Sequence, residues 1–188
     1  MKKQKNVHLE LMKFPKDKFE IAQWQRDYPD TEGFKNIRKY ILEDNIYTNL
    51  MEVIELNHET FAIGEEEQKL ALVAKLDDET IIAWILLDIF NLDTPEPGIF
   101  LQYICMHPLY QNKGYGTQIG KELFLSTEKY LSIKPSYIFS YIEKTNLASQ
   151  KLYKKFNFKL SECSENFLRA TTTQPKLISN SDPKALGE

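Results

Sequence analysis

Hydrophobic residues recur along this chain at two different spacings, and each spacing indicates a type of element. Alternating apolar and polar positions, or short β-branched and aromatic runs between turn residues, are typical of strands. We therefore predict strands over residues 7–14, 70–76, 80–90, 99–106 and 137–142, and a closing hairpin over 159–163 and 167–171. The polar turn Asp77-Asp78-Glu79 makes an antiparallel hairpin of 70–76 and 80–90.

Apolar residues spaced by three and four predict the helices. Two helices are expected between residues 18 and 47, interrupted at Tyr28-Pro29-Asp30, whereas 49–67 shows no clear element. A third, amphipathic helix has an apolar side formed by Ile119, Leu123, Phe124, Thr127 and Leu131. A short fourth helix spans 146–156, with a buried face formed by Ala148, Leu152 and Phe156.

The order of these elements predicts an α/β (α+β) fold with a mixed, mainly antiparallel central sheet flanked by helices. With 188 residues, the chain is the size of one domain. We assign that domain to residues 1–172. The stretch 173–188 is polar and contains Pro175 and Pro183, which is typical of a flexible tail.

Composition and charge narrow the class of partner. Apolar residues make up 42% of the chain and aromatic residues 12%, as in proteins that fold around a core. The net charge is −3 with acids and bases interspersed, which argues against nucleic acid or an anionic membrane as a partner. No apolar run is long enough for a signal peptide or a membrane span, so we expect a cytoplasmic protein with Cys105 and Cys163 reduced.

The clearest chemical signal lies between the strand at 99–106 and the helix that follows it. Gln111-Asn112-Lys113-Gly114-Tyr115-Gly116-Thr117 places two glycines at a helix start, where unpaired N–H groups and the helix dipole favour phosphate oxygens. Lys113 adds a mobile positive charge. The segment is not a P-loop, because its lysine precedes the glycine. A dinucleotide fingerprint fits poorly, because Gly114, Gly116 and Gly120 leave one residue too many.

Gln111, Gly114 and Gly116 match the Gln/Arg-x-x-Gly-x-Gly/Ala loop of the GNAT N-acetyltransferase superfamily, which this segment resembles. The preceding stretch 103–110 is similar to the family's strand and its x-Pro-x-Tyr turn. Further on, Asn146-x-x-Ser149-x-x-Leu152-Tyr153 resembles the family's Asn-x-x-Ala/Ser-x-x-Leu-Tyr helix. Asn157 stands where the family usually has glycine, and asparagine also tolerates a positive φ. The resemblance is specific over residues 99–158.

The resemblance implies an N-acetyltransferase that moves an acetyl group from acetyl-CoA to a primary amine on a small molecule, peptide or protein. It implies that the strands 100–106 and 137–142 splay around the donor, that Tyr153 assists the departing CoA thiolate, and that residues 18–67 cover the acceptor cleft. It also implies donor-binding positions at Ile104, Cys105, Met106, Gln111, Asn112, Lys113, Gly114, Tyr115, Gly116, Thr117, Asn146 and Ser149. Independently of the family, Asn146, Ser149 and Tyr153 share one polar stripe of their helix, which suits a cleft wall.

Several alternatives stay open. The chain could be a non-catalytic acyl-CoA sensor or regulatory module, or a transferase for a longer acyl donor. The strand expected to bear a base offers only Gln102 and Tyr103, which leaves water with Glu143 or Glu96 as the proton acceptor. A homodimer formed through a free edge strand is a fold-level analogy.

Cysteine and histidine residues give no sign of further chemistry. We expect no metal, because His8, His58 and His107 lack ligand spacing. His107, at a strand end before proline, is expected to be structural. Cys105 is expected to be a core residue rather than a nucleophile.

Overall fold

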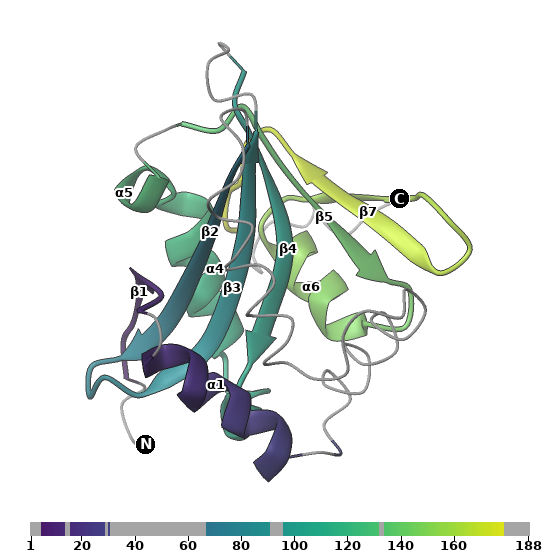
Figure 1. Ribbon diagram of the computed structural model, residues 1–188. Helices are drawn as coiled ribbons and strands as arrows, with labels where there is room; N and C mark the ends of the chain where they lie inside the picture. The colour runs from purple at the N-terminus through teal and green to yellow at the C-terminus, as the bar shows by residue number, and fades with distance from the viewer. Residues whose placement is uncertain are drawn as a thin grey trace.

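The computed structural model describes residues 5–13, 16–28, 30, 67–90, 96–131 and 134–178. Within these residues, seven strands form one mixed sheet in the order β1-β2-β3-β4-β5-β7-β6 (Figure 1). Every neighbouring pair is antiparallel except β4 and β5. The mixed, mainly antiparallel sheet predicted from the sequence is confirmed.

Most element boundaries lie close to the predicted ones. The strands are β1 (Val7–Leu11), β2 (Glu67–Leu76), β3 (Ile81–Phe90), β4 (Gly98–Met106), β5 (Tyr137–Glu143), β6 (Lys159–Glu162) and β7 (Phe167–Thr172). The helices are α1 (Lys16–Asp27), α4 (Tyr115–Leu125), α5 (Glu128–Leu131), α6 (Leu147–Lys155) and the 3-10 turn η1 (Pro108–Tyr110). None of these described helices is long and apolar enough to cross a membrane. The helix expected before residue 47 and most of the segment 49–67 lie outside the described residues.

The sheet separates two apolar layers, because side chains alternate across its central strands. Ile85 and Leu87 of β3 belong to a cluster that includes residues of α4 and α6. Trp84 and Leu86 belong to a second cluster, which includes Trp24 of α1. Figure 1 shows α1 on one side of the sheet and both α4 and α6 on the other. We call these sides the α1 face and the α4/α6 face.

The amphipathic helix expected to continue to Leu131 is interrupted, so the prediction of one helix was wrong. α4 ends at Leu125, Ser126 is its C-cap, and α5 begins at Glu128. Thr127 is buried, and its hydroxyl donates a hydrogen bond to the carbonyl of Leu123 at 2.8 Å. That bond satisfies a carbonyl that the end of a helix leaves open. Apolar periodicity does not record such a polar stop.

The buried face of α6 also differs from the prediction. Tyr153 is only 4% exposed and lies in the core, whereas Ala148, which was expected there, is exposed. Tyr153 packs against Phe124 of α4 and against Phe158, with ring centroids 5.8 and 4.9 Å apart. Burying these large aromatic rings removes far more apolar surface from water than burying an alanine, which determines the rotation of the helix.

Residues 173–178, expected to begin a flexible tail, dock against the end of α6. The backbone N–H of Ile178 donates to the carbonyl of Lys155 at 2.8 Å, which satisfies one of the open carbonyls of the helix. Asn157, in the turn after α6, has a φ of 65°, a positive angle that asparagine tolerates. Residues 179–188 lie outside the described part of the chain.

Candidate active site

The parallel pair β4–β5 separates after three residue pairs, and this gap organises the site. The ladder joins Gly98–Phe100 to residues 137–139 and stops there, although both strands continue (Figure 1). One residue further on, the hydroxyl of Ser140 donates to the carbonyl of Leu101 at 2.8 Å and holds the end of the gap together. The splay predicted for these strands is therefore present. We call the gap beyond Leu101 and Ser140 the fork.

The start of α4 presents backbone N–H groups beyond the end of β4. Gly114 is the N-cap, with a φ of 84°, and within the described residues no side chain caps the helix. The N–H of Thr117 is bonded to the carbonyl of Gly114 at 3.1 Å. The remaining N–H groups of the first turn and the positive end of the helix dipole make this loop suitable for an anionic ligand, as the sequence indicated.

Some side chains around this loop hold it in place, and others carry positive charge. Gln111 donates from Nε2 to the carbonyl of Met106 at 3.1 Å, so its amide ties the loop to the end of β4. Lys113 is exposed, with Nζ 6.0 Å from the ring centroid of Tyr110. Lys155 of α6 reaches across and donates to Thr117 Oγ1 at 3.2 Å. Sequence reasoning missed Lys155, because nothing in the α6 pattern shows that its last turn lies beside the start of α4.

Two glycines in α4, four residues apart, have different surroundings. A Cβ placed on Gly116 would lie 3.7 Å from Cε of Met106, which is an ordinary contact. A Cβ placed on Gly120 would lie 2.4 Å from Cε2 of Phe156. Gly116 therefore leaves space outside the helix start, whereas Gly120 allows α4 and α6 to approach each other closely.

The structure places the predicted donor residues of α6 in a helix cap. Asn146 is the N-cap of the helix, and its Oδ1 accepts a hydrogen bond from the N–H of Ser149 at 3.0 Å. This contact is sufficient to explain an asparagine at this position. The expected polar stripe is shorter than predicted, because Tyr153, its third member, is buried.

The hydroxyl of Tyr153 lies at the closed end of the fork. Its polar partner is the side chain of Ser140, which also bonds to Leu101 across the gap. Burial raises the pKa of Tyr153 well above its ordinary value, and the Ser140 contact offsets this in part. The side chain therefore stays protonated and can donate a hydrogen bond throughout the neutral range.

The three predicted positions on β4 point to opposite faces of the sheet. Ile104 and Met106 pack toward the α4/α6 face, while Cys105 lies in the cluster beneath α1. Burial raises the pKa of the Cys105 thiol to about 12, as expected for a core residue rather than a nucleophile. His107 Nδ1 accepts from the N–H of Leu109 at 3.1 Å, which is the structural role predicted for it.

A carboxylate that sequence reasoning missed lies on β3, opposite Phe100 of β4 and near the closed end of the fork. Asp88 accepts a hydrogen bond from Nε2 of Gln102, so a residue on β4 is joined to an acid on the neighbouring strand. The register between β3 and β4 shifts at Leu86/Leu87, and this irregularity turns Gln102 toward Asp88. No sequence signal marks the shift, because both strands read as nearly continuous apolar runs.

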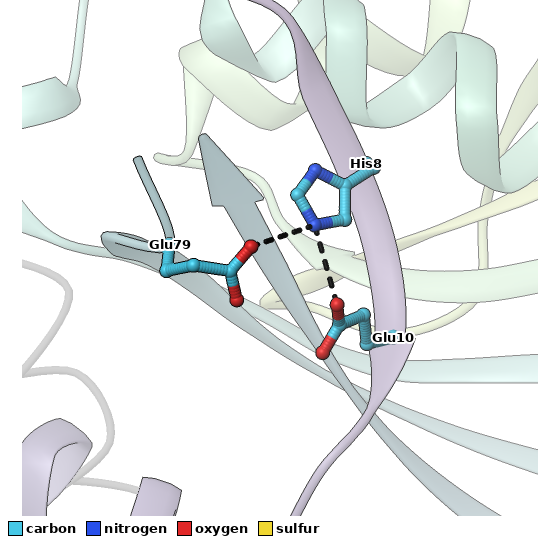
Figure 2. Close-up of side chains that lie close together, drawn as sticks. All are labelled: His8, Glu10 and Glu79. Atoms are coloured by element: carbon cyan, nitrogen blue, oxygen red, sulfur yellow. Dashed lines mark ion pairs between the residues drawn. The ribbon is translucent and has the colours of Figure 1, made fainter. Parts of the chain in front are cut away.

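Three potential metal ligands come together away from the fork, which the histidine spacing did not indicate. Figure 2 shows His8, Glu10 and Glu79, whose ligand atoms lie within 4.8 Å of one another. Lys75 Nζ is 3.0 Å from Glu10 and 3.4 Å from Glu79, and its side chain is 5% exposed. Both carboxylates therefore already pair with a buried ammonium group that would repel a cation. We interpret the cluster as an ion-pair network joining β1 to the β2–β3 turn.

The chain was compared with models of protein families and with known proteins. A model of the acetyltransferase (GNAT) family matches residues 21–158. The fold is similar to the PaiA N-acetyltransferase of Thermoplasma acidophilum in complex with coenzyme A, with a TM-score of 0.60, 19% identity, and 89% of this chain and 99% of that chain covered. No curated protein sequence matches the chain.

Two further solved structures have the same fold. The first is spermidine N-acetyltransferase from Vibrio cholerae in complex with CoA and spermine, with a TM-score of 0.62, 16% identity and coverage of 90% and 96%. The second is the N-acetyltransferase PseH of Campylobacter jejuni in complex with acetyl coenzyme A, with a TM-score of 0.55, 18% identity and coverage of 89% and 99%.

Proposed function

The chain belongs to the acetyltransferase (GNAT) family, and from that premise we propose that it transfers an acetyl group from acetyl-CoA to a primary amine. The fork between β4 and β5, which opens toward the uncapped start of α4, is the observation that carries the proposal. The open edge of β4 suits an extended, amide-containing pantetheine arm, and the helix start suits its diphosphate. Lys155 and Lys113 supply positive charge beside that helix start.

The proposed reaction is direct attack of the amine on the thioester. The ammonium form first loses one proton to solvent. The neutral nitrogen then forms a bond to the acetyl carbon, the C–S bond breaks, the nitrogen loses a second proton to solvent, and the CoA thiolate takes up a proton. Only the neutral amine attacks. At pH 7, deprotonation costs about 4.6 kcal/mol for an amine of pKa ~10.4, and about 1 kcal/mol for one of pKa ~7.7.

Tyr153 is the proposed hydrogen-bond donor to the departing sulfur. With ordinary pKa values of ~10 and ~8.5, proton transfer from tyrosine to a thiolate is uphill by about 2 kcal/mol. Burial raises the pKa of Tyr153, which makes full transfer still less favourable. We therefore propose that Tyr153 stabilises the thiolate by a hydrogen bond and that the proton arrives from solvent.

Thermal unfolding with and without acetyl-CoA tests the donor site. At about 100 Kd the ligand stabilises the native state by ~2.7 kcal/mol, a shift of about 5–10 °C for a chain of this size. Gly116→Leu should abolish the shift, because its side chain occupies the helix start, whereas Lys176→Gln on the C-terminal segment should keep it. An unchanged melting temperature of the wild-type protein with acetyl-CoA and CoA would refute the donor site.

Turnover distinguishes the transferase from the alternatives. Release of free thiol from acetyl-CoA in the presence of amines is expected for an enzyme, whereas a sensor would bind the donor and release none. Comparing acetyl-CoA with longer acyl-CoA donors tests the chain length, which the fork does not define. The acceptor screen should include polyamines, because one fold relative was solved with spermine.

A further inference from the structure

A cavity of about 330 Å³ lies on the α1 face at the closed end of the fork. Residues of four adjacent strands, β3, β4, β5 and β7, line it. They are Asp88, Phe90, Phe100, Tyr137, Phe139 and Arg169. The volume falls within the range of small-molecule sites, and the cavity borders the strands between which the donor is proposed to lie.

Stacked aromatic rings form the floor of this cavity. Phe100 of β4 and Phe139 of β5 stack with ring centroids 4.8 Å apart and planes 9° from parallel. Phe90 meets Phe139 edge to face at 5.7 Å. A floor of this kind binds the hydrocarbon part of a ligand but offers it no charge partner, so recognition of charge depends on the two ends of the cavity.

The two ends carry opposite charges. At one end, the Asp88 carboxylate is held by Gln102. At the other end, the Arg169 guanidinium lies 5.0 Å from the ring centroid of Phe139, and no carboxylate pairs with it in the part of the chain that the structure describes. β3 and β7 are three strand spacings apart, about 14 Å at the backbone. The two charged residues therefore lie on opposite sides of the strands that carry the aromatic floor.

We propose that this cavity binds the acetyl acceptor, and that the acceptor is a primary amine that also carries a carboxylate, as an amino acid does. Its ammonium group pairs with Asp88, its carboxylate pairs with the planar guanidinium of Arg169, and its hydrocarbon part lies on Phe100 and Phe139. The inference rests on the proposed function, since it assigns the acceptor of that same reaction.

Asp88 acts here as a binding group that positions the acceptor nitrogen beside the fork. It pairs with the ammonium form of the acceptor and is not the group that takes up the ammonium proton. That proton goes to solvent, the neutral nitrogen forms the new C–N bond, and CoA leaves as the thiol. Arg169 takes no part in these steps and determines which amines bind.

The test compares acceptors that differ only in the carboxylate. Thiol release from acetyl-CoA is measured with phenylalanine, leucine and 4-aminobutyrate, each beside its own amide, and with spermidine. We expect kcat/KM for each acid to exceed that for its amide by about tenfold or more, the effect of one charge-assisted contact. For the α-amino acids this preference opposes intrinsic reactivity, because an α-amine beside an amide has a pKa near 7.7 and is more often neutral.

Variants at the two ends of the cavity sharpen the comparison. Arg169→Gln should lower kcat/KM for the acids about tenfold while leaving the amides unchanged, and Arg169→Lys should keep part of the preference. Asp88→Asn keeps the shape of the side chain and the contact with Gln102, and it should lower kcat/KM for acids and amides alike. Lys176→Gln removes one positive charge from an exposed residue that does not line the cavity, and it should change kcat/KM for neither the acids nor the amides. Thermal unfolding of each variant confirms that it is folded.

The outcomes separate this inference from the proposed function. Amides or spermidine acetylated as well as the acids, or an equal loss for acids and amides in Arg169→Gln, would overturn the carboxylate-bearing acceptor and leave the transferase standing. The inference also fails if acetyl-CoA binds but none of these acids is acetylated. Failure of acetyl-CoA to bind at all would overturn the proposed function itself.

Discussion

On the α4/α6 face, Phe124 contacts Phe156 and Phe158 with ring centroids 5.2 and 5.0 Å apart, in a cluster of apolar residues. The α1 face is apolar only beneath α1, and toward β5 and β7 it presents Asp88 and Arg169 around an aromatic floor. The same strands thus carry a close-packed layer on one side and a chemically mixed surface on the other. A packed layer holds the fork and the start of α4 in place, whereas charges and rings beside a cavity can select a ligand.

The largest expected difference between the two faces is in the stability lost when one aromatic side chain on each face is truncated to alanine. Phe156→Ala removes a fully buried ring between α4 and α6 and should lower the free energy of unfolding by about 3–5 kcal/mol. Phe139→Ala, at a half-buried ring lining the cavity, should cost much less. Urea unfolding of both variants measures the difference, and equal losses would contradict the division between a packed and a binding face.

Replacing each of the two glycines of α4 by alanine tests the same difference between the packed layer and the site. Gly120→Ala should destabilise by about 1–3 kcal/mol, because its Cβ collides with Phe156. Gly116→Ala should be neutral or stabilising by up to about 1 kcal/mol, since alanine favours the helix and the added carbon makes an ordinary contact. Phe156→Leu in the Gly120→Ala background should restore part of the loss. Similar midpoints in urea for the two alanine variants would show that the close approach of α4 and α6 is unimportant.

Tyr153 packs in the core of the α4/α6 face, and its hydroxyl reaches the closed end of the fork. Removing that hydroxyl therefore tests a role in the reaction separately from a role in packing. Tyr153→Phe should lower kcat about tenfold and change the acetyl-CoA-induced melting shift little. Because burial raises the pKa of Tyr153, the wild-type rate should show no Tyr153 deprotonation limb up to pH 10, where an ordinary tyrosine ionises. A pH–rate profile of both proteins checks this. A fall in the wild-type rate below pH 10 that is absent from the phenylalanine variant would contradict it.

The smallest expected effect concerns the ion-pair cluster of β1, far from the fork. The hydrogen bond from Lys75 lowers the pKa of Glu10 below 4.5, so this pair contributes stability above that pH and loses it as the pH falls through the lowered value. Lys75→Met should remove this contribution, about 1 kcal/mol, and make stability less dependent on pH between about 5 and 3. Midpoints in urea across that range give the slope. If the dependence of the midpoint on pH is the same in the variant and the wild type, the Glu10–Lys75 pair does not contribute to stability.

Sequence patterns predicted the elements around the start of α4 well, because the information that specifies them is local. The strand 98–106, the loop with Gly114 and the helices after it follow one another in the chain, and each has a period or turn signal of its own. Where local patterns failed, a polar contact or a large ring decided the outcome. Thr127 stopped α4 with a hydrogen bond to Leu123, and Tyr153 took the buried side of α6.

By itself, the sequence determined that the chain forms a mixed sheet with a phosphate-suited helix start, since hydrophobic period, glycine spacing and helix capping act between near neighbours. The tertiary structure decided which distant residues meet. Asp88 reaches Gln102 through a register shift, and Arg169 reaches Phe139 because β7 lies beside β5. Register and strand order depend on long-range pairing of strands that look alike in sequence. For that reason, the proposed acceptor site is apparent only in the folded chain.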